Sequence, residues 1–217
     1  MIVAEKPRFI FVHVFKTGGT SVKRVLRRYA MKPGQEFANF FLKRIGIPQF
    51  GPTYYPDHLT AGELVEQVGK ERFDSYYSFG FVRNPWDWEV STYKYILKNQ
   101  KHFNHEAVKS LKGFGEYLRW RCDGRFQLQQ DFLYLNGKQL VDFVGRFETL
   151  NEDFQSVCRQ LQIRHQLPVL NRTGGAAYQS YFTDELVELV RCTYQSDIDE
   201  FGYQFDNPGG FAEREPI

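Results

Sequence analysis

Short apolar runs alternate with longer mixed stretches along this chain. Arg8–Phe15 and Ser75–Val82 are rich in aromatic and β-branched residues, which predicts two buried strands. We expect a helix after each of them. Thr20 or Ser21 can cap the first helix, and Pro85 suits the first turn of the second. The pattern so far is strand, loop, helix, repeated.

Later segments continue this alternation. The sequence predicts four further helices, at Thr60–Gly69, Phe114–Arg121, Asn151–Leu161 and Asp184–Phe201. Phe132–Leu135 and Leu140–Phe147 are expected to be two short strands across the Asn136-Gly137 turn. Strands that alternate with helices predict an α/β fold with a central, mostly parallel sheet flanked by helices, a three-layer sandwich of the P-loop type. Ligands of such sheets bind beyond the carboxyl ends of the strands.

Composition narrows the class of protein. The 217 residues fit a single domain over 1–217, with residues 204–217 as a tail. A net charge of +2 gives no reason to expect nucleic acid. Residues 94–125 carry eight basic and three acidic side chains, which indicates either a solvated face or a positive field around an anion site.

Cysteine usage and hydropathy bear on the compartment. Cys122, Cys158 and Cys192 are odd in number and form no metal-binding spacing, so we expect no metal and a reducing environment. The apolar run near the N-terminus is too short for a signal peptide, and no segment has the length of a membrane span. These features favour a soluble protein.

The loop after the first strand has the chemistry of an anion site. It consists of Lys16, Thr17, Gly18, Gly19, Thr20 and Ser21. Its glycines let the backbone approach a ligand, and the helix that follows presents N–H groups to an anion. The chain has no Gly-Lys-Ser/Thr, so a magnesium-nucleotide phosphotransferase is poorly supported. An ordinary glycine-containing turn is the alternative interpretation.

The second strand ends in another candidate anion site. Arg83 stands at the strand end, and Ser91 lies about two helical turns further on. The arginine fork and the hydroxyl could hold one phosphate between them. Alternatively, Arg83 could pair with a carboxylate of the following helix, such as Asp87.

Together the two loops resemble those of the sulfotransferases that use 3′-phosphoadenosine 5′-phosphosulfate (PAPS). The resemblance implies that the loop from Lys16 to Ser21 holds the phosphosulfate. It also implies that Arg83 and Ser91 hold the 3′-phosphate. PAPS is then the co-substrate, 3′-phosphoadenosine 5′-phosphate (PAP) the product, and no metal is required. Phe15 departs from the family, whose members often carry proline there.

Segments nearer the C-terminus resemble the carbohydrate-type branch of the family. They include Gly145–Glu148 and the run from Asn171 to Thr173. The resemblance adds Arg146, Asn171, Arg172 and Thr173 to the cofactor-binding residues. Residues 31–52 and 100–130 match no segment of the family and are expected to be elaborations on the acceptor side.

Lys16 and a histidine are the expected catalytic groups. Lys16 would stabilise charge on the bridging oxygen of the leaving group. Of the five histidines, His58 precedes a predicted helix in a segment comparable to the one that carries a catalytic histidine in carbohydrate-type sulfotransferases. The alternative is that His58 caps the helix at Thr60, with Glu63 or His105 as the base.

The sequence therefore predicts a sulfotransferase acting on a hydroxyl acceptor, expected to be a glycan or glycoside. A lipid-linked or small-molecule alcohol stays open. A non-catalytic PAP-binding domain and a P-loop kinase with an unusual motif are the competing functions. We expect a cytoplasmic bacterial enzyme, or else a Golgi-lumenal catalytic domain without its anchor. The sequence makes no prediction of the oligomeric state.

Overall fold

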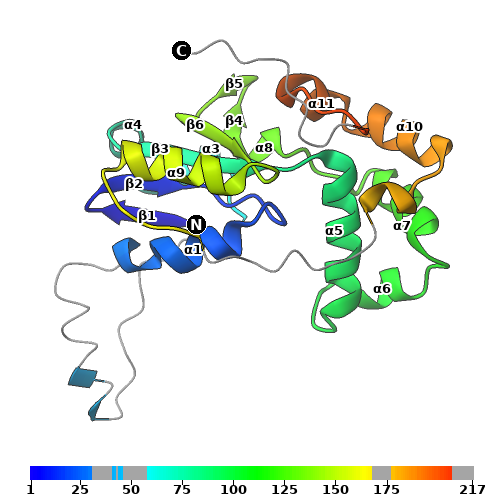
Figure 1. Cartoon of the computed structure of the whole chain (residues 1–217), viewed down its shortest axis with the longest axis horizontal. Coiled ribbons are helices and arrows are strands. Elements are labelled where there is room, and N and C mark those ends of the chain that lie inside the picture. The colour runs from blue at the N-terminus through cyan, green and yellow to red at the C-terminus, as the bar shows by residue number, and fades with distance from the viewer. Residues whose placement is uncertain (31–40, 43, 46–57, 168–176, 207–217) are drawn as a thin grey trace. The chain divides into compact units, whose positions relative to one another are not determined.

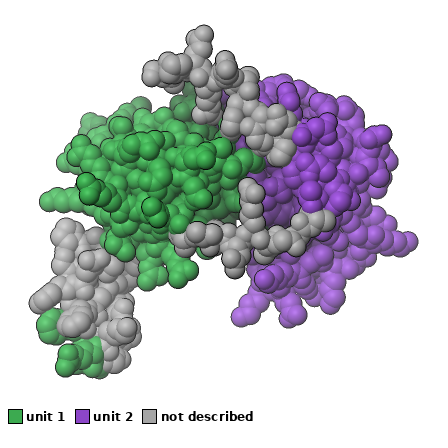
Figure 2. All heavy atoms as spheres, viewed as in Figure 1, with its two compact units in different colours: residues 1–82, 131–170 green, residues 83–130, 171–217 purple. Residues whose placement is uncertain are grey.

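The alternating pattern of the sequence corresponds to real strands and helices in a computed structural model. It describes residues 1–30, 41–42, 44–45, 58–167 and 177–206. The chain divides into two compact units (Figure 2), the first comprising Met1–Val82 and Asp131–Leu170, the second Arg83–Gln130 and Asn171–Ile217. The single domain expected from the chain length stays a prediction.

The first unit is built on a four-stranded sheet (Figure 1). Its strands are β1 Ile2–Glu5, β2 Arg8–Phe11, β3 Tyr77–Val82 and β6 Phe143–Arg146, in the spatial order β1-β2-β3-β6. β1 runs antiparallel to β2, whereas β2, β3 and β6 are parallel. The expected fold, a mostly parallel sheet in a mixed α/β protein with flanking helices, is confirmed.

The parallel pairing brings three strand ends to one edge of the sheet. Val12 N–H donates to the Phe79 carbonyl at 2.9 Å, one residue beyond the end of β2. Val82 of β3 lies opposite Arg146 of β6, and Phe147 N–H donates to the Val82 carbonyl at 2.7 Å. The loops that follow β2 and β6 therefore lie at the same edge, as expected for a ligand site in such sheets.

Alternation along the strands places aromatic rings on one face. The helices α1 Gly19–Leu26 and α9 Leu150–Gln160 cover this face with their apolar residues. The buried cluster includes Phe9, Phe11, Phe79, Phe81 and Phe154. Burial of each such ring stabilises the fold by about 1.5–3 kcal/mol.

The other face of the sheet is covered as well. Gly80 alternates with the phenylalanines of β3, and a Cβ built on it would lie 2.5 Å from Leu133 of α8 Gln130–Leu133. This unit also contains η1 Arg27–Ala30, α3 Ala61–Val68 and α4 Lys70–Asp74.

The expected hairpin at Asn136-Gly137 exists, but its strands differ from the prediction. β4 Tyr134–Leu135 pairs with β5 Lys138–Gln139, not with residues 140–147. Phe132 and Leu133 are helical, and residues 143–146 form β6, which pairs with β3. The apolar run around Val144 is buried in the main sheet, where parallel pairing with β3 outweighs continuation of the short hairpin.

Helices form the second unit. They are α5 Pro85–Lys98, α6 His105–Lys109, α7 Phe114–Cys122, η2 Tyr178–Tyr181, α10 Asp184–Thr193 and α11 Gln195–Phe201. The single helix predicted over Asp184–Phe201 is wrong, because Tyr194 leaves helical geometry between α10 and α11. The Tyr194 side chain is buried, and its hydroxyl donates to Glu89 at 2.6 Å.

Within the described residues, none of the helices combines the length and the apolar character that a membrane crossing would need.

Candidate active site

The loop between β2 and α1 is strained at Lys16. The φ of Lys16 is 62°, a left-handed conformation that is uncommon for a residue other than glycine. The next residue, Thr17, is buried, and its hydroxyl donates to the Val14 carbonyl at 2.8 Å. This bond closes the turn before the glycines. A strained residue that its surroundings hold in place is a typical feature of functional sites.

Both glycines of the loop are required by close contacts. Gly18 has a φ of 83°, and a Cβ built on it would lie 2.5 Å from Leu150. A Cβ on Gly19 would overlap the imidazole ring of His13. The loop backbone is therefore pressed against the start of α9 on one side and against His13 on the other. Only glycine fits at either position without displacement of a neighbour.

The N-terminus of α1 is suited to an anion. Its N-cap is Gly18, which offers no side-chain cap, and its first turn contains no acidic residue. The expectation that Thr20 or Ser21 caps this helix is wrong, since both lie inside the first turn. The Ser21 N–H donates to the Gly18 carbonyl at 3.0 Å, so the N–H groups of Gly19 and Thr20 are the ones that an external anion can accept from. Thr20 is exposed and Ser21 is buried.

His58 lies next to this loop. Its ring centroid is 5.3 Å from that of His13 and 5.9 Å from that of Phe15, which it meets edge to face. His58 also has a positive φ, 75°, and is exposed. Because the His13 ring occupies the space beside Gly19, His58 is one ring removed from the glycine loop. Histidine and loop come from segments that are about 40 residues apart in the sequence.

The helix cap and the two alternative bases, Glu63 and His105, have defined hydrogen-bond partners. α3 is capped by Thr60, whose hydroxyl accepts from Glu63 N–H at 3.1 Å, while Glu63 accepts from Thr60 N–H at 2.7 Å. The cap therefore occupies the Glu63 carboxylate. His105 is buried, with Nδ1 hydrogen bonded to the Ile96 carbonyl at 2.9 Å. Both rival bases have structural partners.

Arg83, in the second unit, is fixed both at its side chain and at its backbone. Its Nε and Nη2 donate to Asp87 Oδ2 at 2.9 and 2.7 Å. The side chain of Gln129 accepts from Arg83 N–H and donates to the Arg83 carbonyl, both at 2.8 Å. The expected alternative, a pairing of Arg83 with Asp87, is therefore present. This pairing orients the guanidinium.

Gln129 is itself held by a buried carboxylate. Asp197 of α11 is fully buried and accepts from the N–H groups of Gln129 at 2.7 Å and Gln130 at 3.0 Å. The sequence reasoning missed Gln129 and Asp197, which lie 46 and 114 residues from Arg83. No spacing motif joins residues so far apart. Ser91, the other expected phosphate ligand, is the seventh residue of α5 and is half-buried.

The other residues expected to bind the cofactor are Arg146 and the run from Asn171 to Thr173. Arg146 is buried at the end of β6, and its N–H donates to Asp153 at 2.6 Å. Its role as a cofactor ligand stays a prediction. Asn171, Arg172 and Thr173 lie outside the described residues. Among the residues that the structure describes, no group of three or more His, Cys, Asp or Glu side chains could hold a metal ion.

Comparisons with known proteins identify similar sequences and a similar fold. A sequence model of the sulfotransferase family matches residues 1–204. An uncharacterized protein of Archaeoglobus fulgidus is 36% identical over 126 residues, which are 57% of this chain and 97% of that protein. The crystal structure of mouse sulfotransferase SULT7A1 complexed with PAP matches with a TM-score of 0.56 and 17% identity, covering 91% of this chain and 86% of that chain. At this identity the last match concerns the fold.

Proposed function

The chain belongs to the sulfotransferase family, and on this basis we propose that it transfers a sulfuryl group from PAPS to a carbohydrate hydroxyl. The observation that carries the proposal is the arrangement in the first unit. A glycine loop with a strained lysine packs against His13, and the ring of His13 packs against His58. An anion-binding backbone, a cation and a potential base are thereby gathered at one sheet edge.

The donor fits the residues that are present. The glycine turn and the uncapped start of α1 provide backbone N–H groups for the 5′-phosphosulfate. Thr17, Thr20 and Ser21 belong to the same turn, and Lys16 adds a positive charge. The 3′-phosphate of the same donor is assigned to Arg83 and Ser91, with Asp87 orienting the arginine fork. Arg146, Asn171, Arg172 and Thr173 complete the proposed set of donor-binding residues.

The transfer is an in-line displacement at sulfur. The acceptor oxygen forms a bond to sulfur, the bond from sulfur to the bridging oxygen breaks, and PAP leaves with the electron pair. The acceptor proton passes to the imidazole of His58. Lys16 stabilises the negative charge that grows on the bridging oxygen, which lowers the barrier more than it strengthens ground-state binding.

Two measurements test this function. Thermal-shift titration compares PAP, ADP and ATP with magnesium, and PAP is expected to stabilise the protein by about 2.7 kcal/mol at a hundredfold excess over its Kd. ADP, which lacks the 3′-phosphate, is expected to stabilise it less. Transfer from radiolabelled PAPS to a panel of sugars then measures turnover. His58→Ala is expected to lower turnover by about 10²- to 10⁴-fold and to keep the PAP shift.

His165→Gln is the matched control, because His165 lies in the same unit and bonds to Tyr29 rather than to the loop. It is expected to retain turnover. Equal stabilisation by PAP and ADP would contradict the assignment of the 3′-phosphate site. PAP binding without any turnover in the unmodified protein would favour a non-catalytic PAP-binding domain, and magnesium-dependent stabilisation by ATP alone would favour a kinase.

A further inference from the structure

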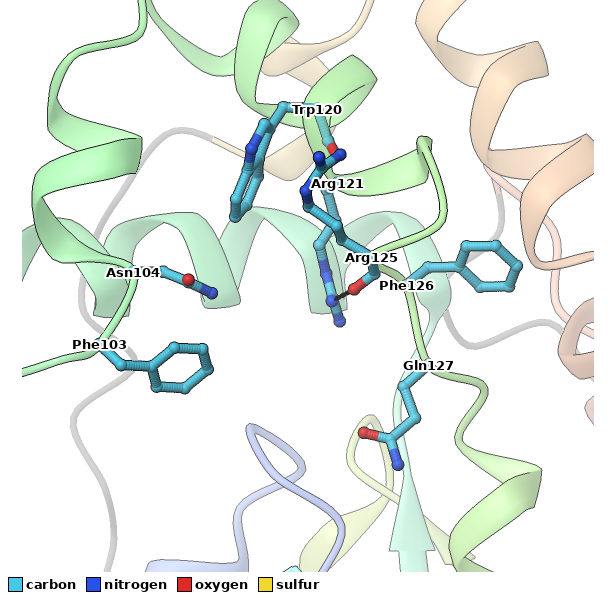
Figure 3. A pocket seen from close by; sticks show the side chains of 7 residues that line it. All are labelled: Phe103, Asn104, Trp120, Arg121, Arg125, Phe126 and Gln127. Carbon is cyan, nitrogen blue, oxygen red and sulfur yellow. Dashed lines mark hydrogen bonds between the residues drawn. The ribbon is translucent and has the colours of Figure 1, made fainter.

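A pocket of about 450 Å³ opens in the second unit, within the size range of ligand sites. Its lining includes Phe103, Asn104, Trp120, Arg121 and Gln127 (Figure 3). These residues belong to the segment 100–130, which the sequence left without a family counterpart. In Figure 3 the ring of Phe103 and the amide of Asn104 face a space that Arg121 and Gln127 border from across it.

Phe103 presents an open aromatic face. Its side chain is 89% exposed, the highest value among the large hydrophobic residues that the structure describes. One face of the ring stacks on His102, with centroids 4.5 Å apart and planes at 22°. His102 is fixed in turn, because its Nδ1 accepts from Asn104 N–H at 3.1 Å. The ring is therefore held in place while its other face remains available for stacking.

Two amide side chains at the pocket are not engaged in the described part of the protein. Asn104 is the N-cap of α6 but makes no capping bond, and neither its amide nor that of Gln127 hydrogen bonds to another described residue. An amide both donates and accepts, which suits hydroxyl groups. An anion offers acceptors only, so it would leave the amide oxygens facing negative charge.

The positive charges of the pocket are balanced. Arg121 Nε lies 3.4 Å from a carboxylate oxygen of Glu89, which is fully buried. Glu89 also accepts from the hydroxyls of Tyr117 at 2.7 Å and Tyr194 at 2.6 Å. Arg121 Nη1 also donates to the Arg125 carbonyl, so two of the three guanidinium nitrogens of Arg121 have partners.

Arg125 is similarly engaged. Its Nη1 lies 3.2 Å from Asp123, and its guanidinium lies over the Trp120 ring at 5.3 Å from the centroid. Each pocket arginine thus has its own carboxylate. The environment that results is aromatic, rich in amides and close to electrically neutral.

We propose that this pocket binds a neutral sugar ring of the acceptor, stacked on Phe103 and hydrogen bonded through Asn104 and Gln127. The inference rests on the proposed function, since it names the class of acceptor that the transferase would take. It selects neutral glycans or glycosides over the acidic glycans that the basic character of residues 94–125 would suggest.

Isothermal titration calorimetry of the whole chain tests the proposal. Cellotetraose and maltotetraose serve as neutral probes, and tetragalacturonate serves as the anionic probe. At least one neutral probe is expected to bind more tightly than tetragalacturonate. Phe103→Ala is expected to weaken that binding about three- to tenfold, the scale of one aromatic stacking contact. Asn104→Ala is expected to weaken it as well.

Leu135→Ala is the control, because Leu135 is an exposed hydrophobic residue of β4 that does not line the pocket. It is expected to leave binding unchanged. Tighter binding of tetragalacturonate, absence of binding by both neutral probes, or equal binding by Phe103→Ala and the unmodified protein would each overturn the proposal.

The PAP thermal shift separates this failure from failure of the proposed function. Phe103→Ala is expected to keep the full PAP shift. If the pocket variants bind sugars normally while PAP still stabilises the protein, the pocket assignment alone is wrong. If PAP does not stabilise the unmodified protein, the donor assignment is wrong whatever the sugars do.

Discussion

Two residues at the proposed active site have a left-handed backbone conformation that is uncommon among the described residues other than glycine. Among the described residues other than glycine, four have a positive φ, and two of these are Lys16 and His58. Such a conformation costs on the order of 1 kcal/mol or more for a residue with a Cβ. Neighbours have to hold it, and here Thr17 and the rings of His13 and Phe15 are in place to do so.

Gly19→Ala tests the contact between loop and ring. The new methyl group would overlap the His13 imidazole, so ring or loop has to move. We expect a loss of about 1–3 kcal/mol in the free energy of unfolding, typical of overpacking, together with weaker PAP binding. Urea denaturation and the thermal shift by PAP measure the two effects.

The double variant Gly19→Ala with His13→Ala is expected to regain part of the lost stability, because the overlapping ring is gone. Gly115→Ala is the control, since a Cβ there has only ordinary contacts, the nearest at 3.4 Å. Strictly additive effects of the two substitutions would contradict the proposed contact.

Gln129 provides a second test at the residue scale. Gln129→Ala removes both bonds to the Arg83 backbone, and each lost bond of this buried kind costs about 1–3 kcal/mol. Because the strand end carrying the guanidinium is loosened, the preference for PAP over ADP is expected to fall. Gln127→Ala, two residues away and exposed, is expected to preserve both stability and preference. An unchanged preference in Gln129→Ala would separate this network from phosphate recognition.

At the scale of elements, the cap of α3 determines where His58 stands. His58 lies two residues before the N-cap Thr60, so fraying of this helix end would move it. Thr60→Ala is expected to destabilise the protein by about 1 kcal/mol and to lower turnover, whereas Thr60→Ser keeps the accepting oxygen and is expected to lower neither. Chemical denaturation and the PAPS transfer assay measure these effects. Full turnover in Thr60→Ala would show that His58 does not depend on the cap.

Elements with local signals can be predicted from the sequence. Pro85 after an apolar run marks the start of α5, and Thr60 with Glu63 marks α3. The predicted pairing of β6 is wrong, because a nearby Asn-Gly turn is a local signal while its true partner β3 lies more than 60 residues away. The sequence does not predict β1, which has only four residues and owes its stability to pairing with β2.

The same distinction applies to the site. The loop from Lys16 to Ser21 is contiguous, so the sequence alone displays its motif. The position of His13 between Gly19 and His58 depends on how three separate segments pack, so no local pattern in the sequence displays it. Gln129 and Asp197 act through backbone contacts, for which a sequence carries no characteristic spacing.

On the scale of the whole molecule, the two compact units interleave along the chain. Each is assembled from two stretches that are separated by part of the other. Both units also contain a histidine whose pKa is lowered by burial. In the first unit, the pKa of His165 is lowered chiefly by burial and further by the charge of Arg28. In the second unit, the pKa of His102 is lowered chiefly by burial and further by His105.

These pKa shifts predict acid sensitivity in both units. A histidine whose pKa lies below 6.5 in the folded protein is protonated first in the unfolded chain as the pH falls. Its stabilising contribution is therefore complete above pH 6.5 and is lost as the pH falls through the folded pKa. The pKa of the Glu5 carboxylate is lowered chiefly by the Tyr76 hydroxyl. The contribution of Glu5 to stability is therefore lost only below pH 4.5. We therefore expect urea denaturation to show a declining free energy of unfolding between about pH 7 and pH 5. The decline should be shallower in His165→Gln and in His102→Gln, and unaltered slopes in both variants would contradict the assignment.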